Sequence, residues 1–239
     1  IAGLSIADVD ASTGTMTVTL AVAHGTVTVL TGTGVTLTTN STASVQLSGS
    51  LSDINALLAT ANAVTYTPAG NYNGSDTLNV TVSDGGNTGS GGTKSGAGSV
   101  ALTVNAVNDA PINTVPLITQ TTAEDTAKVI AGLSVADVDG ASGNFTVTLA
   151  VDHGTVTVLA GTGVTITTNS TGSVQLSGSV SDINALLATT NAVTYTPAAN
   201  YNGSDTLTMT TSDGGNTGLG GPQNDIDTVA ISITAVNDA

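Results

Sequence analysis

The amino-acid sequence predicts an all-β protein built from two tandem β-sandwich modules, each carrying one short inserted helix. Three observations support this prediction. The chain matches itself when it is shifted by 129 residues; threonine and valine alternate along many short segments; and one stretch in each copy has apolar residues at helical spacing. Because Thr and Val branch at Cβ and suit a pleated surface, their dominance favours strands over helices.

The internal repeat defines the domain organisation. Residues 1–110 align without a gap with residues 130–239, and 82 of the 110 aligned positions are identical. Each unit has the size of a domain. We therefore predict a repeat without its first strand at 1–110 and a complete repeat at 111–239. The segment 111–129 has no counterpart ahead of the first unit, so we expect either an excerpt from a longer array or a first strand supplied by another chain.

Period-two alternation of apolar and polar residues marks the strands of the complete repeat. Gly- and Asn-rich clusters separate them, as turns require. Seven or more short strands with regular turns favour a β-sandwich. The predicted strands are 145–151, 155–160, 164–168, 173–176, 192–197, 206–211 and 229–236, preceded by a first strand at 111–120 and a second at about 127–135.

The stretch 181–190 predicts the helix. Its apolar residues Ile183, Leu186 and Leu187 share one helical face, and Ser181 or Asp182 can cap the N-terminus. The equivalent Asp53 is expected to cap the helix of the first copy. Tyr201 lies just before a predicted strand, at the position where sandwiches often place a tyrosine corner.

Composition excludes several classes of function. The chain has 2 Lys+Arg against 17 Asp+Glu, a net charge of −15. It therefore has no basic patch for nucleic acid, and an anionic membrane surface would repel it. With no Cys, thiolate chemistry and disulfides are absent. The two histidines, His24 and His153, lie in equivalent predicted turns, and no Ser-His-Asp arrangement recurs with a base in reach, so we do not expect an enzyme.

Several motifs together resemble a known family. The motifs AEDTA (123–127), ADVD (136–139), YTPAANYNGSDTL (195–207), TSDGG (211–215) and AVNDA (235–239) follow one another in this order and span most of the repeat. In this they resemble the cadherin-like tandem repeats of large bacterial surface adhesins, including those exported by type I (RTX) secretion. An additional stretch at about 159–191 departs from the shorter members. The resemblance implies a cadherin/Ig-like sandwich, an extracellular position at the bacterial cell surface, calcium binding and a stalk-like role.

The acidic residues are predicted to gather at the two ends of each unit, because successive loops of an antiparallel sandwich fall at opposite ends. Ca²⁺ binds six to eight oxygens from carboxylates, amides and carbonyls, so these clusters predict Ca²⁺ sites. The alternative is that Asp in DGG and NGSD only shapes turns. The predicted ligands at the first end are Asn108, Asp109, Asp137, Asp139 and Asp213, joined by Asp76 of the preceding unit, with Asp8, Asp10 and Asp84 as the first-copy equivalents. The predicted ligands at the second end are Glu124, Asp125, Asp205, Asn237 and Asp238.

Taken together, the sequence favours a structural function: Ca²⁺-rigidified extender repeats of a bacterial surface adhesin, with adjacent repeats or other copies of the protein as partners. Two alternatives remain open. One is a carbohydrate- or self-binding adhesive module, which the 2% aromatic content disfavours for sugar stacking. The other is a repeat of a self-assembling surface filament or layer. A glycan array with and without calcium separates the extender from the glycan-binding module.

Overall fold

The computed structural model describes residues 1–11, 14–86, 91–140, 143–215 and 217–237. Contacts between residues divide the chain into unit 1, Ile1–Ala106, and unit 2, Val107–Ala239. The boundary falls four residues before the one predicted from the repeat. Val107 pairs with Leu219, and the Asn108 N–H donates to the Leu219 carbonyl at 2.8 Å, so the start of the linker belongs to unit 2.

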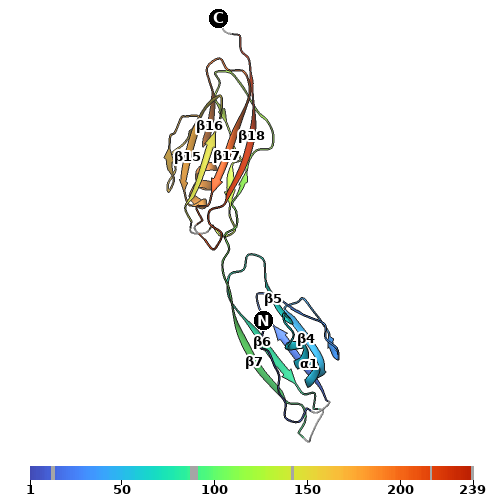
Figure 1. Ribbon diagram of the computed structural model, residues 1–239. Coiled ribbons are helices and arrows are strands. Elements are labelled where there is room, and N and C mark those ends of the chain that lie inside the picture. The colour runs from blue at the N-terminus through green and yellow to red at the C-terminus, as the bar shows by residue number, and fades with distance from the viewer. Residues whose placement is uncertain (12–13, 87–90, 141–142, 216, 238–239) are drawn as a thin grey trace. The chain divides into compact units, whose positions relative to one another are not determined.

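Unit 2 is built almost entirely from short strands, as predicted (Figure 1). Strands predicted from the period-two pattern are present within a few residues of their expected bounds. The elements are β8 (Ile112–Thr114), β9 (Gln120–Ala123), β10 (Lys128–Val129), β11 (Ser134–Ala136), β12 (Phe145–Ala150), β13 (Gly154–Val158), β14 (Thr165–Thr167), β15 (Ser173–Gly178), α2 (Val180–Leu187), β16 (Val193–Pro197), β17 (Gly203–Ser212) and β18 (Asn224–Thr234).

The strands of unit 2 form the layers of a sandwich. Within the described residues, the larger sheet has the order β14-β15-β12-β17-β18-β9, and the smaller sheets are β10-β16-β13 and β11-β8. All neighbours are antiparallel except β9, which lies parallel to β18 with Gln120 opposite Ile231. The long pair β17 and β18 runs side by side along the unit (Figure 1). The unit is an Ig/cadherin-like β-sandwich, which confirms the predicted fold class.

Unit 1 repeats this arrangement without the leading strands. Its described strands form the sheets β3-β4-β1-β6-β7 and β2-β5. The elements are β1 (Thr15–Ala21), β2 (Gly25–Val29), β3 (Val35–Leu37), β4 (Ser44–Ser50), α1 (Leu51–Leu58), β5 (Val64–Pro68), β6 (Gly74–Ser83) and β7 (Ser95–Val104).

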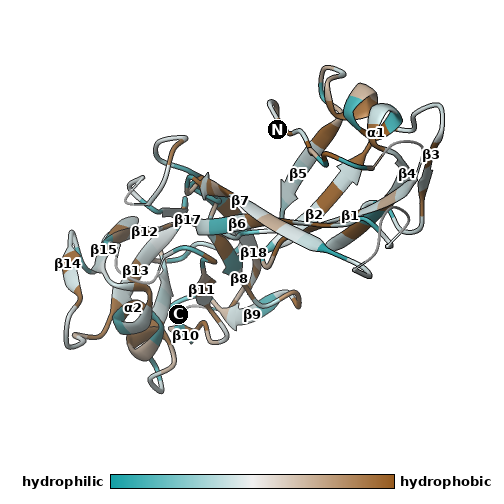
Figure 2. Cartoon of the chain, turned by 90° about the horizontal axis from the view of Figure 1, so that it is seen from below, coloured by the Kyte–Doolittle hydropathy of each residue, from teal (hydrophilic) through white to brown (hydrophobic). Residues whose placement is uncertain are grey.

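Each unit has its own apolar core between the sheets. In unit 2 the fully buried Phe145, Leu149, Leu207 and Met209 come from adjacent strands, and the core of unit 1 is built in the same way. Helices α1 and α2 carry both apolar and polar residues, coloured brown and teal in Figure 2, and each buries one Ile and two Leu side chains: Ile54, Leu57 and Leu58 in α1, and Ile183, Leu186 and Leu187 in α2. No helix in the described residues is both long and apolar enough to cross a membrane.

The helix is confirmed, but its cap is not the residue predicted. The N-cap is Ser179, whose side-chain oxygen accepts the Asp182 N–H at 3.1 Å, while its hydroxyl donates to the Asp182 carboxylate at 2.7 Å. Ser50 and Asp53 repeat this exchange in unit 1. Asp182 and Asp53 thus lie in the first turn of their helices, where a negative charge interacts favourably with the helix dipole. The N-cap is the serine three residues earlier, Ser179 or Ser50.

The leading segment of unit 2 also differs from its prediction. The expected strand 111–120 contains only the short strand β8, and β9 begins at its last residue, Gln120; the two strands belong to different sheets. Pro116 lies between them, and since proline has no N–H it cannot continue the ladder of β8. The expected second strand at about 127–135 is likewise two short strands, β10 and β11.

Candidate metal centre

One end of unit 2, here called the proximal end, is where the chain enters through Val107 and Asn108. The loop that follows β11 and the turn that follows β17 lie at this end with Asn108. The Asn108 side-chain amide donates to the Asp213 carboxylate at 2.6 Å and to the Gly221 carbonyl at 3.0 Å. Asn108 is 6% exposed and Asp213 is 3% exposed, so this contact is a buried one. The linker is therefore fastened to the turn after β17 by a charge-assisted hydrogen bond.

Asp137 and Asp139 belong to the same end. The Asp139 N–H donates to Asp137 Oδ1 at 2.9 Å, which closes the turn, and Asp139 Oδ2 accepts the Asp109 N–H at 3.2 Å. The structure thus gathers within unit 2 five of the six oxygen-bearing residues predicted for this end. Their backbone donors come from the turn itself and from the linker.

Two carboxylate oxygens of this cluster have no donor. Asp137 Oδ2 and Asp139 Oδ1 are buried and without a hydrogen-bond partner among the described residues. Burial and the neighbouring Asp139 carboxyl raise the pKa of Asp137 to about 6. The shared hydrogen bond with Asp137, followed by the Asp109 N–H, lowers the pKa of Asp139. Two buried acceptor oxygens side by side are stabilised by a proton or by a cation.

The turn after β17 is formed by Asp213. Its Oδ1 accepts the N–H groups of Gly215 and Gln223, both at 2.8 Å. In unit 1, Asp84 accepts the N–H groups of Gly86 at 2.8 Å and Lys94 at 2.7 Å in the same way. The turn-shaping role of these aspartates therefore accounts for part of their hydrogen bonding in both copies.

Unit 1 repeats the acidic loop as well. The Asp10 N–H donates to Asp8 Oδ1 at 3.0 Å, as Asp139 does to Asp137. The hydrogen bond and charge of Asp8 raise the pKa of Asp10, and the charge of Asp84 contributes in the same direction. The arrangement of three aspartates is thus set by the local sequence of each repeat.

The donor set at the proximal end suits a hard cation, because every candidate ligand offers oxygen. Within the described ranges, however, no group of three His, Cys, Asp or Glu side chains is arranged so that it could hold a metal ion. The unpaired oxygens of Asp137 and Asp139 are two potential ligands. Calcium binding would require Asp213, Asp109 or further carbonyl and water oxygens to join them.

Asp76 and Asp205 have a different environment from the other predicted ligands. In unit 2, Asp205 is 5% exposed, and its carboxylate accepts the Tyr195 hydroxyl at 2.8 Å and the His153 N–H at 3.0 Å. The N–H groups of Asp152 and Thr206 complete the set. Burial opposes ionisation, but these four donors outweigh it and lower the pKa of Asp205.

Asp76 has the same four donors in unit 1. The Tyr66 hydroxyl and the His24 N–H both donate at 2.9 Å. The N–H groups of Ala23 and Thr77 donate at 3.1 and 2.7 Å. Despite burial, these hydrogen bonds lower the pKa of Asp76 to about 2. Since all four donors come from its own unit, the carboxylate ties β5 and β6 to the turn after β1.

The tyrosines of these clusters were not singled out from the sequence. Burial and the Asp205 carboxylate raise the pKa of Tyr195 above its usual range, and burial with Asp76 raises the pKa of Tyr66 to about 12. The predicted tyrosine corner at Tyr201 is instead a local contact: its hydroxyl donates to the Ser204 carbonyl at 2.8 Å, three residues downstream. Strand alternation gives the missing signal, because Asp205 shares its face with Leu207 and Met209 and so points inward.

Glu124 is fixed at the opposite, distal end of unit 2. It is 5% exposed and accepts the Val236 N–H at 2.5 Å, which holds the chain leaving β18. The nearby Asp125 accepts the Asn200 N–H at 3.3 Å. Asn237 is exposed, and Asp238 lies outside the described residues.

The two histidines lie in the turns predicted for them. His153 stacks on Tyr201 with ring centroids 4.2 Å apart, and its Nδ1 lies 3.8 Å from the Asp205 carboxylate. His24 and Tyr72 repeat the stack at 4.3 Å. Each imidazole therefore contacts a tyrosine ring and the buried aspartate of its own unit.

The comparisons with known proteins concern the fold. The family described as Bacterial Ig domain (Big_9) matches residues 50–96. Curated protein sequences gave no match to the chain.

Among solved structures, the chain is similar to extracellular cadherin repeats. Against the protocadherin gammaB7 EC3-6 cis-dimer structure, identity is 14% and the TM-score 0.34, with 89% of this chain and 40% of that one covered. Against mouse cadherin-23 EC22-24, identity is 19% and the TM-score 0.36, with 89% of this chain and 55% of that one covered. Against human CDH23 EC21-23, identity is 16% and the TM-score 0.40, with 98% of this chain and 68% of that one covered. The chain thus spans about half the length or less of the first two structures, and identities of this size concern the fold alone.

Proposed function

We propose that the chain is a pair of Ca²⁺-rigidified extender repeats from a bacterial cell-surface adhesin. Two near-identical sandwiches in tandem suit a spacer, since each added repeat increases reach without a new binding site. The match of residues 50–96 to a bacterial Ig domain family supports a bacterial source for the chain. The surface location and the adhesin context rest on the motif resemblance.

One observation carries the metal part of the proposal. The buried Asp137 Oδ2 and Asp139 Oδ1 have no donor, beside the linker residues Asn108 and Asp109. A bound Ca²⁺ would neutralise these carboxylates. Asp137 and Asp139 would hold it from one turn, while the linker residues would couple the ion to the chain that enters the unit. Because the ion would bind only where these elements meet, it would stiffen the linker.

Thermal unfolding in calcium and in chelator tests the proposal. A ligand that binds only the folded state stabilises it, and extracellular modules bind Ca²⁺ with Kd of about 10⁻⁴–10⁻³ M. At ten times Kd, each site adds roughly 1.4 kcal/mol to the free energy of unfolding. We therefore expect calcium to raise the thermal midpoint of the chain, with the far-UV circular dichroism nearly unchanged.

Two variants of equal charge make the test specific. Asp139→Asn keeps an oxygen but removes one charge, so the calcium-dependent shift should shrink. Asp227→Asn removes the same charge from β18 and should leave the shift intact. A midpoint that is the same in chelator and in excess calcium would contradict the proposed metal binding.

A further inference from the structure

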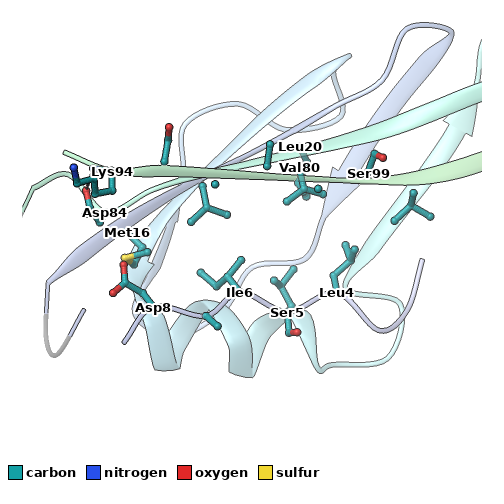
Figure 3. A pocket seen from close by; sticks show the side chains of 18 of the residues that line it. Leu4, Ser5, Ile6, Asp8, Met16, Leu20, Val80, Asp84, Lys94 and Ser99 are labelled. Atoms are coloured by element: carbon teal, nitrogen blue, oxygen red, sulfur yellow. Dashed lines mark hydrogen bonds between the residues drawn. The ribbon is translucent and has the colours of Figure 1, made fainter. Parts of the chain in front are cut away.

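Unit 1 contains an open cavity where unit 2 contains a strand. The cavity has a volume of about 560 Å³ and lies between the leading residues 3–8 and the strands β6 and β7. Figure 3 shows Leu4 and Ile6 on one side of it, facing Val80 on the other. We call this cavity the strand groove.

In unit 2 the equivalent space is filled by β8. The strand pairs antiparallel with β11, so that Asn113 lies opposite Val135. The repeat places residues 5–7 of unit 1 at the position of β11, and their backbone enters no sheet among the described strands. Ile6 is nevertheless held as Val135 is: the side-chain amide of Asn55 exchanges hydrogen bonds of 2.8 and 2.9 Å with its backbone, as Asn184 does with Val135. The pairing edge of residues 5–7 is therefore held in place.

Burial shows what a strand in this groove would cover. In unit 2, the groove-facing residues of β17 and β18 are at most 1% exposed: Met209, Thr211, Val229 and Ile231. Their repeat equivalents in unit 1 are only partly buried: Val80, Val82, Val100 and Leu102. The core of unit 1 is thus open on the side that β8 closes in unit 2.

The outer edge of β7 is open in the same way. In unit 2, β9 pairs parallel with residues 231–234 of β18. The equivalent residues 102–105 lie at the edge of the unit 1 sheet, where the order of the described strands ends with β7. A segment that enters the groove like β8 and continues like β9 would therefore fill the cavity and pair with the open edge of β7.

The two copies differ most around this groove. Ten of the nineteen residues that line it differ from their repeat equivalents, against 28 of 110 positions in the whole repeat. Two of the differences remove partners of the β8 residue Asn113, whereas its third partner, the Met209 carbonyl that accepts the side-chain amide at 3.3 Å, is a backbone group that Val80 also has in unit 1. In unit 2, its side chain accepts the Thr211 hydroxyl at 2.5 Å and its N–H donates to the Asp225 carboxylate at 2.6 Å. In unit 1 these positions are Val82 and Gly96.

We propose that the strand groove of unit 1 binds an extended peptide strand that follows the pattern of residues 111–123 but carries an apolar side chain at the position of Asn113. Backbone pairing with residues 5–7 and 102–105 supplies the register, and Val80 and Val82 select the apolar side chain. An asparagine there would lose its hydroxyl partner and be buried against valine.

This requirement disfavours a second copy of the chain as the occupant. Each chain has one segment of this pattern, residues 111–123, and that segment carries Asn113. It already pairs with β11 and β18 in unit 2. To leave that site would expose the core of unit 2 in order to cover the core of unit 1.

The test uses the 239-residue chain and two synthetic peptides, one with the sequence of residues 111–129 and one with the change Asn113→Val. We expect the Val peptide to bind one site per chain in calorimetry, roughly 5–30-fold more tightly than the Asn peptide, which is the ratio that one or two lost interactions produce. Hydrogen exchange should show protection at residues 5–7 and 102–105. Absence of binding by the Val peptide, or equal affinity for both peptides, would overturn the proposal.

Matched variants of the chain sharpen the test. The pair Val82→Thr and Gly96→Asp restores the unit 2 partners and should reverse the preference toward the Asn peptide. A Cβ at Gly98 meets no atom within 4 Å, and its repeat equivalent Asp227 shares the inward face of β18, so Gly98→Leu should fill the groove and abolish binding. Ala101→Leu, on the outward face of β7, should not. If the unmodified chain instead forms dimers that Gly98→Leu dissolves, a second copy is the occupant and the proposal is wrong.

Discussion

At the scale of single residues, the aspartate–tyrosine cluster illustrates how a buried charge can be tolerated in a sandwich with almost no basic side chains. Asp205 has four donors, and three of them are backbone N–H groups. An ionised carboxylate with three or four donors keeps a low pKa without any cation nearby. The sequence indicated an acidic residue at this end of the unit, but the motif NGSD alone does not show that the side chain points inward. The alternation of β17 does.

The Tyr195 hydroxyl is the side-chain member of that cluster and the easiest to remove. Tyr195→Phe leaves the Asp205 carboxylate with one donor fewer in a buried position, which should lower the free energy of unfolding by about 1–3 kcal/mol. Tyr201→Phe, whose hydroxyl only contacts the Ser204 carbonyl near the surface, should cost less. Urea denaturation followed by circular dichroism compares the two. Equal losses would mean that the Asp205 contact contributes nothing specific.

At the scale of elements, the local sequence pattern was enough to predict the strands and the helix, but it was not enough to predict the strands of the leading segment 111–123. Alternating Thr and Val fixed the strands because burial on one face demands a period of two. The segment 111–123 changes from one sheet to the other at Pro116, and such a change depends on the pairing partners β11 and β18, which no local pattern reveals. The cap was misassigned for a related reason: two serines and an aspartate, Ser179, Ser181 and Asp182, compete as caps within four positions.

Ser179 provides the test at this scale. Ser179→Ala removes the acceptor for the Asp182 N–H and the donor to its carboxylate, so the free energy of unfolding should fall by about 0.5–2 kcal/mol. Ser181→Ala is the matched control, because the Ser181 hydroxyl contacts only that of Ser179 in the described structure. Thermal or urea unfolding measures both. A larger loss of stability from Ser181→Ala than from Ser179→Ala would mean that Ser181, as expected from the sequence, is the cap.

At the scale of the whole molecule, the repeat at 129 residues was sufficient to predict two units of one fold. The acidic ends were also predictable, since strand alternation assigns each loop to an end. The sequence did not show which acidic side chains are hydrogen-bonded. Asp76, Asp205 and Glu124 accept hydrogen bonds from donors of their own units, while Asp137 and Asp139 each keep one oxygen without a partner among the described residues.

If calcium stiffens the linker, its removal should change how extended the chain is in solution. Small-angle scattering of the parent should give a larger maximum dimension in calcium than in chelator. Changing Asp137 and Asp139 together to Ala should leave both units folded and the dimension at its chelator value in either buffer. A double variant that still lengthens on addition of calcium would place the stiffening elsewhere.

The most direct measurement is a crystal structure of the chain grown in saturating Ca²⁺, with anomalous scattering used to locate the ions. We predict an ion at the proximal end of unit 2, with oxygens of Asp137 and Asp139 at about 2.3–2.6 Å from it. An anomalous map without a peak there, with the two carboxylates paired only to each other or to water, would contradict it.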